Sequence, residues 1–131
     1  MEDNFKLEII SPEKIIYSDD VMFVTFPSYE GDMTVLKNHI SLISFLRPGI
    51  IKVKKNEGSF EEFFVEDGTA EYFNDNLIIL STSAINIKDV SKNFLDNLDK
   101  DIEKKLADQT ISDHDKYILN HKLNTIREMV I

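Results

Sequence analysis

Residues 26–49, FPSYEGDMTVLKNHISLISFLRPG, decide the fold of this chain. They contain two of its three prolines and two of its four glycines. Short runs of β-forming residues lie between these breakers, so the pattern predicts strand, loop, strand, turn, strand and turn. The polar residues of the predicted connections are Tyr29, Glu30, Asp32, Asn38 and His39. Since connections on a rigid scaffold often carry binding residues, the stretch indicates a binding surface on a β domain.

The first 86 residues show the same pattern, in which short predicted strands alternate with turns. Further runs of β-forming residues are found at 5–10, 14–17, 21–26, 50–53, 60–65, 70–73 and 77–80. The connections between them include predicted turns or loops at 18–20, 54–59 and 74–76. About nine short strands of this kind predict an antiparallel β-sandwich over residues 1–86. The run 21–26 is apolar on both faces, which fits a central strand or a strand whose outer face meets a partner.

The pattern changes near residue 87. Residues 88–131 contain neither proline nor glycine, and the apolar period changes from about 2 to about 3.6. Asp89 is predicted to cap a first helix with an apolar stripe. That stripe consists of Val90, Phe94, Leu98, Ile102 and Leu106.

A second helix is predicted to begin at Ser112, because Ser112 and Asp115 resemble a capping box. Its apolar stripe consists of Ile118 or Leu119, Leu123, Ile126 and Val130. Residues 87–131 are therefore predicted to form a second domain, an antiparallel two-helix hairpin. Helices with one narrow apolar stripe are only marginally stable by themselves in water. Their stripes must therefore pack against the sandwich, against a partner, or against the two at different times. The predicted fold class is α+β with the two parts arranged sequentially along the chain. An N-terminal antiparallel β-sandwich is followed by a C-terminal antiparallel helical hairpin.

Composition argues for a binding protein and against an enzyme. The formal net charge of −9 disfavours nucleic-acid binding, and the lack of a long apolar run disfavours membrane insertion. There is no cysteine, the glycines are isolated, and His39, His114 and His121 are far apart. We expect no catalytic residues, no cofactor and no metal. His39 is either a structural turn residue or a partner contact.

The order of short motifs between Ser11 and Ala84 resembles the epsilon subunit of F-type proton-translocating ATP synthases. These motifs are Ser11-Pro12-Glu13, Glu30-Gly31-Asp32, Leu36-Lys37-Asn38-His39, Leu46-Arg47-Pro48-Gly49, Asp67-Gly68 and Thr82-Ser83-Ala84. The helical hairpin also fits that family, so the resemblance covers essentially the whole chain. The chain departs from the family pattern at Asp19, at Lys37-Asn38 and at Ile40-Ser41.

The resemblance implies a non-catalytic central-stalk subunit that couples proton flow through the c-ring to ATP synthesis by way of gamma. By position, Glu30, Gly31 and Asp32 would face the c-ring. The residues that would lie against gamma are Ser11, His39 and Ser44. The hairpin is a candidate contact to the catalytic alpha and beta subunits. Such a subunit would be peripheral, at the cytoplasmic face of the bacterial inner membrane.

Some relatives sense ATP through the hairpin, with an aspartate and an arginine early in the first helix and an arginine in the second. Here residues 90–95 contain neither group, and only Arg127 remains. We therefore expect no ATP sensing, while inhibition by an extended hairpin stays open. The alternative function is a free-standing adaptor that binds a peptide or a sugar. It would require an exposed groove lined by aromatic residues such as Tyr17, Tyr29 and Tyr72.

Overall fold

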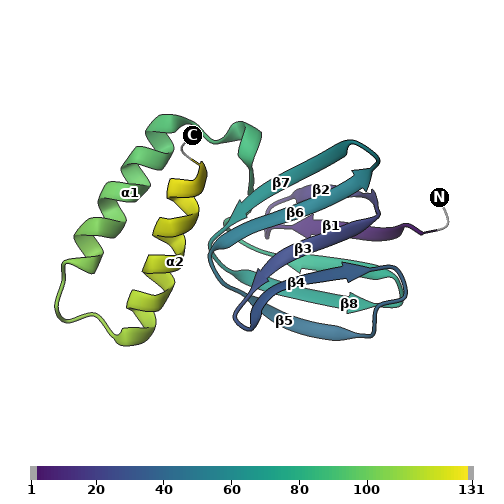
Figure 1. Ribbon diagram of the computed structural model, residues 1–131, viewed down its shortest axis with the longest axis horizontal. Helices are drawn as coiled ribbons and strands as arrows, with labels where there is room; N and C mark the ends of the chain where they lie inside the picture. Colours follow the sequence, from purple (N-terminus) through teal and green to yellow (C-terminus); the bar gives the residue numbers. More distant parts are fainter. Residues whose placement is uncertain (1–2, 130–131) are drawn as a thin grey trace. The chain divides into compact units, whose positions relative to one another are not determined.

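The computed structural model describes residues 3–129, and the chain divides into two units, with the boundary between Ile87 and Lys88 (Figure 1). The strands of the first unit are β1 Phe5–Ile10, β2 Ile15–Val21, β3 Phe23–Ser28, β4 Gly31–Leu36, β5 Leu42–Leu46, β6 Gly49–Asn56, β7 Ser59–Val65, β8 Gly68–Phe73, β9 Asn76–Leu80 and β10 Ile85–Asn86. A 3-10 helix follows at Ile87–Asp89, then α1 at Lys92–Leu106 and α2 at Asp113–Met129.

The strands form one curled sheet in the order β10-β7-β6-β3-β5-β8-β9-β1-β2, with β4 paired to β3. Every pairing is antiparallel except that of β1 with β9. The sheet folds back on itself, and this brings Asp19 of β2 within 2.7 Å of Lys55 of β6, where the two side chains form an ion pair. Alternate side chains point inward and make the apolar core. Its largest members include Phe5, Leu7, Ile9, Phe26, Leu46, Ile51, Phe63, Tyr72, Leu77 and Ile79.

The predicted β-sandwich is confirmed, and so is the central position of β3, which lies between β4 and β6. The turn predicted at 18–20 is wrong, because β2 continues to Val21. Ser18 and Asp19 pair with Glu8 and Leu7 of β1, and this long-range pairing outweighs the local turn preference of Ser-Asp-Asp.

Two predicted loops are tighter than expected. The loop predicted at 54–59 shrinks to Glu57 and Gly58, since β6 runs to Asn56 and β7 begins at Ser59. The connection between β8 and β9 is also two residues long. Its residues Asn74 and Asp75 have φ of 49° and 58°. Positive φ at both positions matches the right-handed twist of a hairpin, which explains the Asn-Asp sequence there.

The first helix begins later than predicted. Its N-cap is Ser91, whose side-chain oxygen accepts a 3.1 Å hydrogen bond from the amide of Phe94. Asp89 is not the cap, because its backbone belongs to the preceding 3-10 helix. Of the predicted stripe Ile102 is buried, as expected, and the other buried residue of the helix is Leu95. Phe94, predicted to be in that stripe, is 41% exposed.

The second helix agrees better with its sequence. The side-chain oxygen of Ser112 accepts a 3.1 Å hydrogen bond from the amide of Asp115, as predicted for a cap. Leu123 and Ile126 are buried as expected. Val130, the last predicted member of the stripe, lies outside the described residues. Helices α1 and α2 lie side by side and run in opposite directions (Figure 1).

Candidate partner-binding surface

Large apolar side chains cover the outer surface of three neighbouring strands. On β5, Ile43 is 73% and Phe45 is 65% exposed, and at the end of β8 Phe73 is 66% exposed. Strand β9 adds Ile78 and Leu80. We call these five residues the apolar face. Exposed apolar clusters of this kind mark interaction sites in soluble proteins.

Strand register brings the members of the apolar face together. Ile43 lies opposite Glu71, which lies opposite Ile78 on the far side of β8. One step along the same face, Phe45 and Leu80 lie on either side of Thr69. Each row therefore has apolar side chains on β5 and β9 and a polar side chain, Glu71 or Thr69, on β8 between them.

A groove of about 710 Å³ adjoins this face at Leu80. Its lining residues are Ile10, Ser11, Pro12, Asp67, Gly68, Thr69, Leu80, Ser81 and Thr82. Gly68 has φ of +148°, and a Cβ there would lie 2.4 Å from the carbonyl oxygen of Leu80. Only glycine allows this close approach of β8 and β9. Ser11, one of the three residues assigned to gamma by resemblance, is therefore next to the apolar face.

The loop at residues 37–41, which carries His39, is held by a polar cluster. The Asp75 carboxylate accepts 2.8 Å hydrogen bonds from the Asn38 amide and from the Tyr72 hydroxyl. The Tyr72 hydroxyl is also 3.1 Å from the carbonyl oxygen of Leu36. The His39 ring makes an edge-on contact with the Tyr72 ring, with centroids 5.6 Å apart. These contacts anchor the loop to the turn after β8.

The same contacts shift two pKa values. Hydrogen bonds from the Asn38 amide and the Tyr72 hydroxyl lower the pKa of Asp75 below its usual value, because they stabilise the carboxylate. Burial, followed by the hydrogen bond to Asp75, raises the pKa of Tyr72 to about 12. The pair therefore consists of a carboxylate and a neutral phenol at neutral pH.

The residues assigned to the c-ring lie together in the hairpin between β3 and β4. Glu30 is in its two-residue turn, and Gly31 and Asp32 begin β4. Gly31 has φ of +117°, which explains the glycine at this position. Asp32 forms a 3.6 Å ion pair with Arg47. We call residues 29–32 the tip.

Ser44 lies in a different environment from Ser11 and His39. Its side chain points into the sandwich and is only 8% exposed. Its hydroxyl donates a 2.9 Å hydrogen bond to the buried hydroxyl of Ser28. The surface of β5 is formed by its neighbours Ile43 and Phe45. Sequence reasoning missed this apolar face, although the alternation of residues 42–46 contained the signal.

The described residues do not support the aromatic groove that the adaptor alternative would require. Tyr72 is 1% exposed and packs edge-on against Phe5 in the core, so it cannot line a surface groove. Tyr17 packs edge-on against Phe63. Two of the three tyrosines named for that groove are therefore engaged in ring contacts of the sandwich, and this does not support the adaptor alternative.

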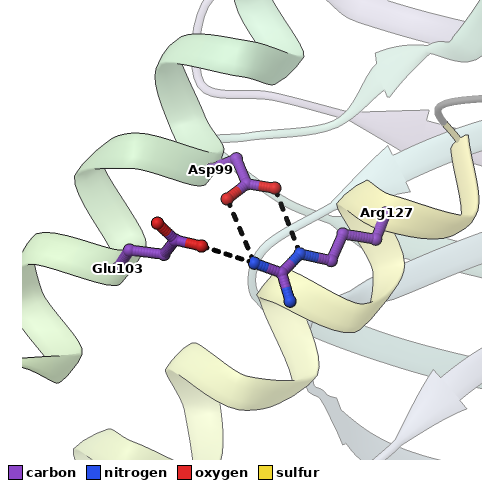
Figure 2. Close-up of polar contacts among 3 residues, drawn as sticks. All are labelled: Asp99, Glu103 and Arg127. Carbon is purple, nitrogen blue, oxygen red and sulfur yellow. Dashed lines mark hydrogen bonds and ion pairs between the residues drawn. The ribbon is translucent and has the colours of Figure 1, made fainter.

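The helical hairpin contains one cluster of charges (Figure 2). Arg127 of α2 makes two hydrogen bonds to Asp99 of α1, at 3.2 and 3.3 Å, and one to Glu103 at 2.6 Å. Two carboxylates of the first helix thus form ion pairs with Arg127, the only arginine of α2. Within residues 3–129, no group of three or more side chains is arranged to hold a metal ion. Nor does any helix of this range combine the length and apolar character needed to cross a membrane.

Comparison with known proteins identifies the family. Residues 4–87 match the model of the ATP synthase delta/epsilon chain β-sandwich domain. The ATP synthase epsilon chain of Pelagibacter ubique is 41% identical over 130 residues, covering 98% of this chain and 99% of that protein. The epsilon chain of Rhizobium etli (strain CIAT 652) is 31% identical, covering 87% of this chain and 84% of its own length.

Solved structures agree on the fold. A chain in the Euglena gracilis mitochondrial ATP synthase (OSCP, F1 and c-ring) superposes with a TM-score of 0.80 at 18% identity, covering 98% of this chain and 82% of its own. A chain from the central stalk and c-ring of the Tetrahymena thermophila enzyme gives 0.66 at 15% identity, covering 95% and 92%. A β-sandwich followed by a two-helix hairpin is the fold of ATP synthase epsilon chains. The chain belongs to the ATP synthase epsilon chain family, whose members are non-catalytic subunits of that complex.

Proposed function

We propose that this chain is the central-stalk subunit that joins gamma to the c-ring and couples proton flow to ATP synthesis. The observation that carries the proposal is the apolar face on a sandwich of this family. A stable contact between proteins usually buries more than about 1,000 Å². The apolar face, the adjoining groove and the loop of His39 together offer a continuous surface for such a contact.

Two parts of the sandwich surface, the apolar face and the tip, have different chemistry, and this supports two partners. The apolar face, together with Ser11 and His39, fits gamma because burying apolar side chains gives a long-lived grip. The tip is polar and acidic, with Glu30 and Asp32 exposed. It fits the polar loops of the c-ring, because exposed charged side chains pair with polar partners.

The location follows from these partners. The chain would be held at the cytoplasmic face of a bacterial inner membrane through the complex and not by its own insertion. The hairpin, residues 88–131, would be a regulatory segment that can reach the catalytic alpha and beta subunits. ATP sensing is not part of the proposal, because Asp99 and Glu103 already neutralise Arg127.

The test is co-purification of gamma from the same organism with tagged full-length chain. Phe45→Ser should abolish or strongly reduce recovery of gamma, because it removes a large, 65% exposed aromatic member of the apolar face. Phe60→Ser is the matched control, since Phe60 of β7 is 55% exposed but lies outside the apolar face. Equal recovery of gamma with Phe45→Ser and Phe60→Ser would contradict the proposal.

A further inference from the structure

Strand β5 connects the apolar face to the tip. Its outward side chains, Ile43 and Phe45, belong to the apolar face, and the side chain between them, Ser44, points inward. The Ser44 hydroxyl donates to the Ser28 oxygen at 2.9 Å, and this oxygen also accepts a 3.1 Å hydrogen bond from the amide of Glu30. Two hydrogen bonds thus lead from the strand of the apolar face to the tip.

Both hydroxyls are buried, with Ser28 1% and Ser44 8% exposed. A buried hydroxyl costs free energy unless it is hydrogen-bonded, so alanine would be the simpler residue at a position that only fills space. The Ser44 hydroxyl donates to the Ser28 oxygen, which also accepts from a backbone amide of the tip. Their arrangement therefore positions the tip as well as filling the core.

The backbone repeats the same connection. The Tyr29 amide donates to the carbonyl oxygen of Phe45 at 3.2 Å, and the Arg47 amide donates to that of Pro27 at 3.1 Å. The ion pair of Arg47 with Asp32 adds a link from the end of β5 to the tip. The tip is consequently bonded to β5 and does not depend on its own two-residue turn alone.

We propose that Ser28 and Ser44 are positioning residues that hold the tip rigid relative to the apolar face. The inference rests on the proposed function, in which the c-ring pushes on the tip and gamma is gripped by the apolar face. A force on an unsupported two-residue turn would bend it, whereas the serine link passes the force to β5. Ser44 therefore acts from inside the sandwich and not as a contact of gamma.

The first experiment follows the amide of Glu30 in the full-length chain by hydrogen exchange. Ser28→Ala removes the acceptor of that amide, so its exchange should rise about fivefold, the change expected from one net hydrogen bond. Thr34→Ala is the matched control, because the Thr34 hydroxyl makes a 2.7 Å hydrogen bond to Thr25 within the β3–β4 hairpin and does not reach β5. Unchanged exchange at Glu30 in Ser28→Ala would overturn the proposal.

The second experiment measures coupling in the reconstituted complex. Ser28→Ala and Ser44→Ala should retain gamma and ATP hydrolysis but lower the ratio of proton pumping to hydrolysis, with Thr34→Ala unchanged. A purely structural role would lower assembly and hydrolysis together and leave this ratio unaltered. An unaltered ratio in both assembled serine variants would overturn the proposal.

If Ser44→Ala does not fold, two variants that have side chains of equal shape replace it in this experiment. Ser44→Thr keeps the hydroxyl, and Ser44→Val has the same shape without it. A lower pumping ratio for Ser44→Val than for Ser44→Thr supports the proposal, and equal ratios overturn it. Failure of the proposed function itself would be seen separately, as normal recovery of gamma with Phe45→Ser.

Discussion

Tyr72 and Asp75 are joined by a 2.8 Å hydrogen bond between the phenol and the carboxylate, across the turn that ends β8. The same carboxylate accepts the amide of Asn38, which is 37 residues away in sequence. This local pair therefore decides where the loop of His39 lies. Two predictions about pH follow from its chemistry.

Tyr72→Phe should remove an alkaline transition. The folded-state pKa of Tyr72 is about 12, above its ordinary value of 10.0. A raised pKa means that the unfolded chain releases this proton at a lower pH than the folded chain does. The contribution of Tyr72 to the free energy of unfolding is therefore fully present below about pH 10 and is lost as pH rises toward 12. The variant should lose about 1.5–3 kcal/mol near pH 7, the usual range for a hydrogen bond to a charged group. Urea unfolding between pH 7 and 12 measures both effects, and an unchanged alkaline loss in Tyr72→Phe would argue against this assignment.

Asp75→Ala should change the acid side of the stability curve. Because the pKa of Asp75 is lowered in the folded chain, its contribution is present above the unfolded pKa of about 3.9 and is lost as pH falls through the folded value. The variant should therefore be less stable at neutral pH and should show a shallower loss on acidification. The amide of Asn38 should also exchange faster. Asp89→Ala, outside this cluster, is the control, and an Asn38 amide equally protected in both variants would contradict the prediction.

Gly49→Ala should destabilise the sandwich by steric conflict. A Cβ at residue 49 would lie 2.6 Å from Cβ and 2.7 Å from Cγ of Pro27, whose ring cannot rotate away. Overpacking of a buried site costs about 1–3 kcal/mol, and denaturant unfolding measures it. Pro27→Gly in the same chain removes both clashing atoms. The double variant should therefore lose less than the sum of the two single losses, and strict additivity would exclude this contact as the cause.

A chain that ends at Ile87 should still support proton-driven ATP synthesis when assembled into the complex. The reason is that the surfaces proposed for gamma and the c-ring belong entirely to the first unit. Synthesis by inverted vesicles containing the shortened chain measures this. Loss of coupling would show that the hairpin has a part in torque transfer, and a rise in ATP hydrolysis would show that it inhibits in the intact chain.

Much of the fold could be predicted because its signals are local. Proline and glycine mark the turns around residues 26–49, and loss of both residues after position 87, with a change of period, marks the hairpin. The cap at Ser112 depends on an amide only three residues away, so the sequence contains all of it. The first cap was harder to predict, since Asp89 and Ser91 are both good caps and only the path of the backbone selects Ser91.

The binding surface was predictable only in part. The tip could be located because Glu30, Gly31 and Asp32 are consecutive in the chain. The alternation of residues 42–46 indicates an outward apolar side of β5, but its joining to β9 could not be predicted, because the two strands are far apart in sequence and are brought together only by the register of β8. The inward direction of Ser44 is likewise a consequence of that register, since a shift of one residue would reverse every side chain of β5.

By itself, the sequence determined the two-part organisation of this protein, its acidic character and its family, because periodicity, charge and motif order are properties of the chain. The tertiary structure alone decided which residues share a surface. It turned Ser18–Asp20 from a turn into strand through the pairing of β2 with β1 and the ion pair of Asp19 with Lys55. It also placed Ser44 behind the apolar face and next to Ser28. The physical reason is that strand pairing is long-range, so its partners and register are settled only when the whole sheet forms.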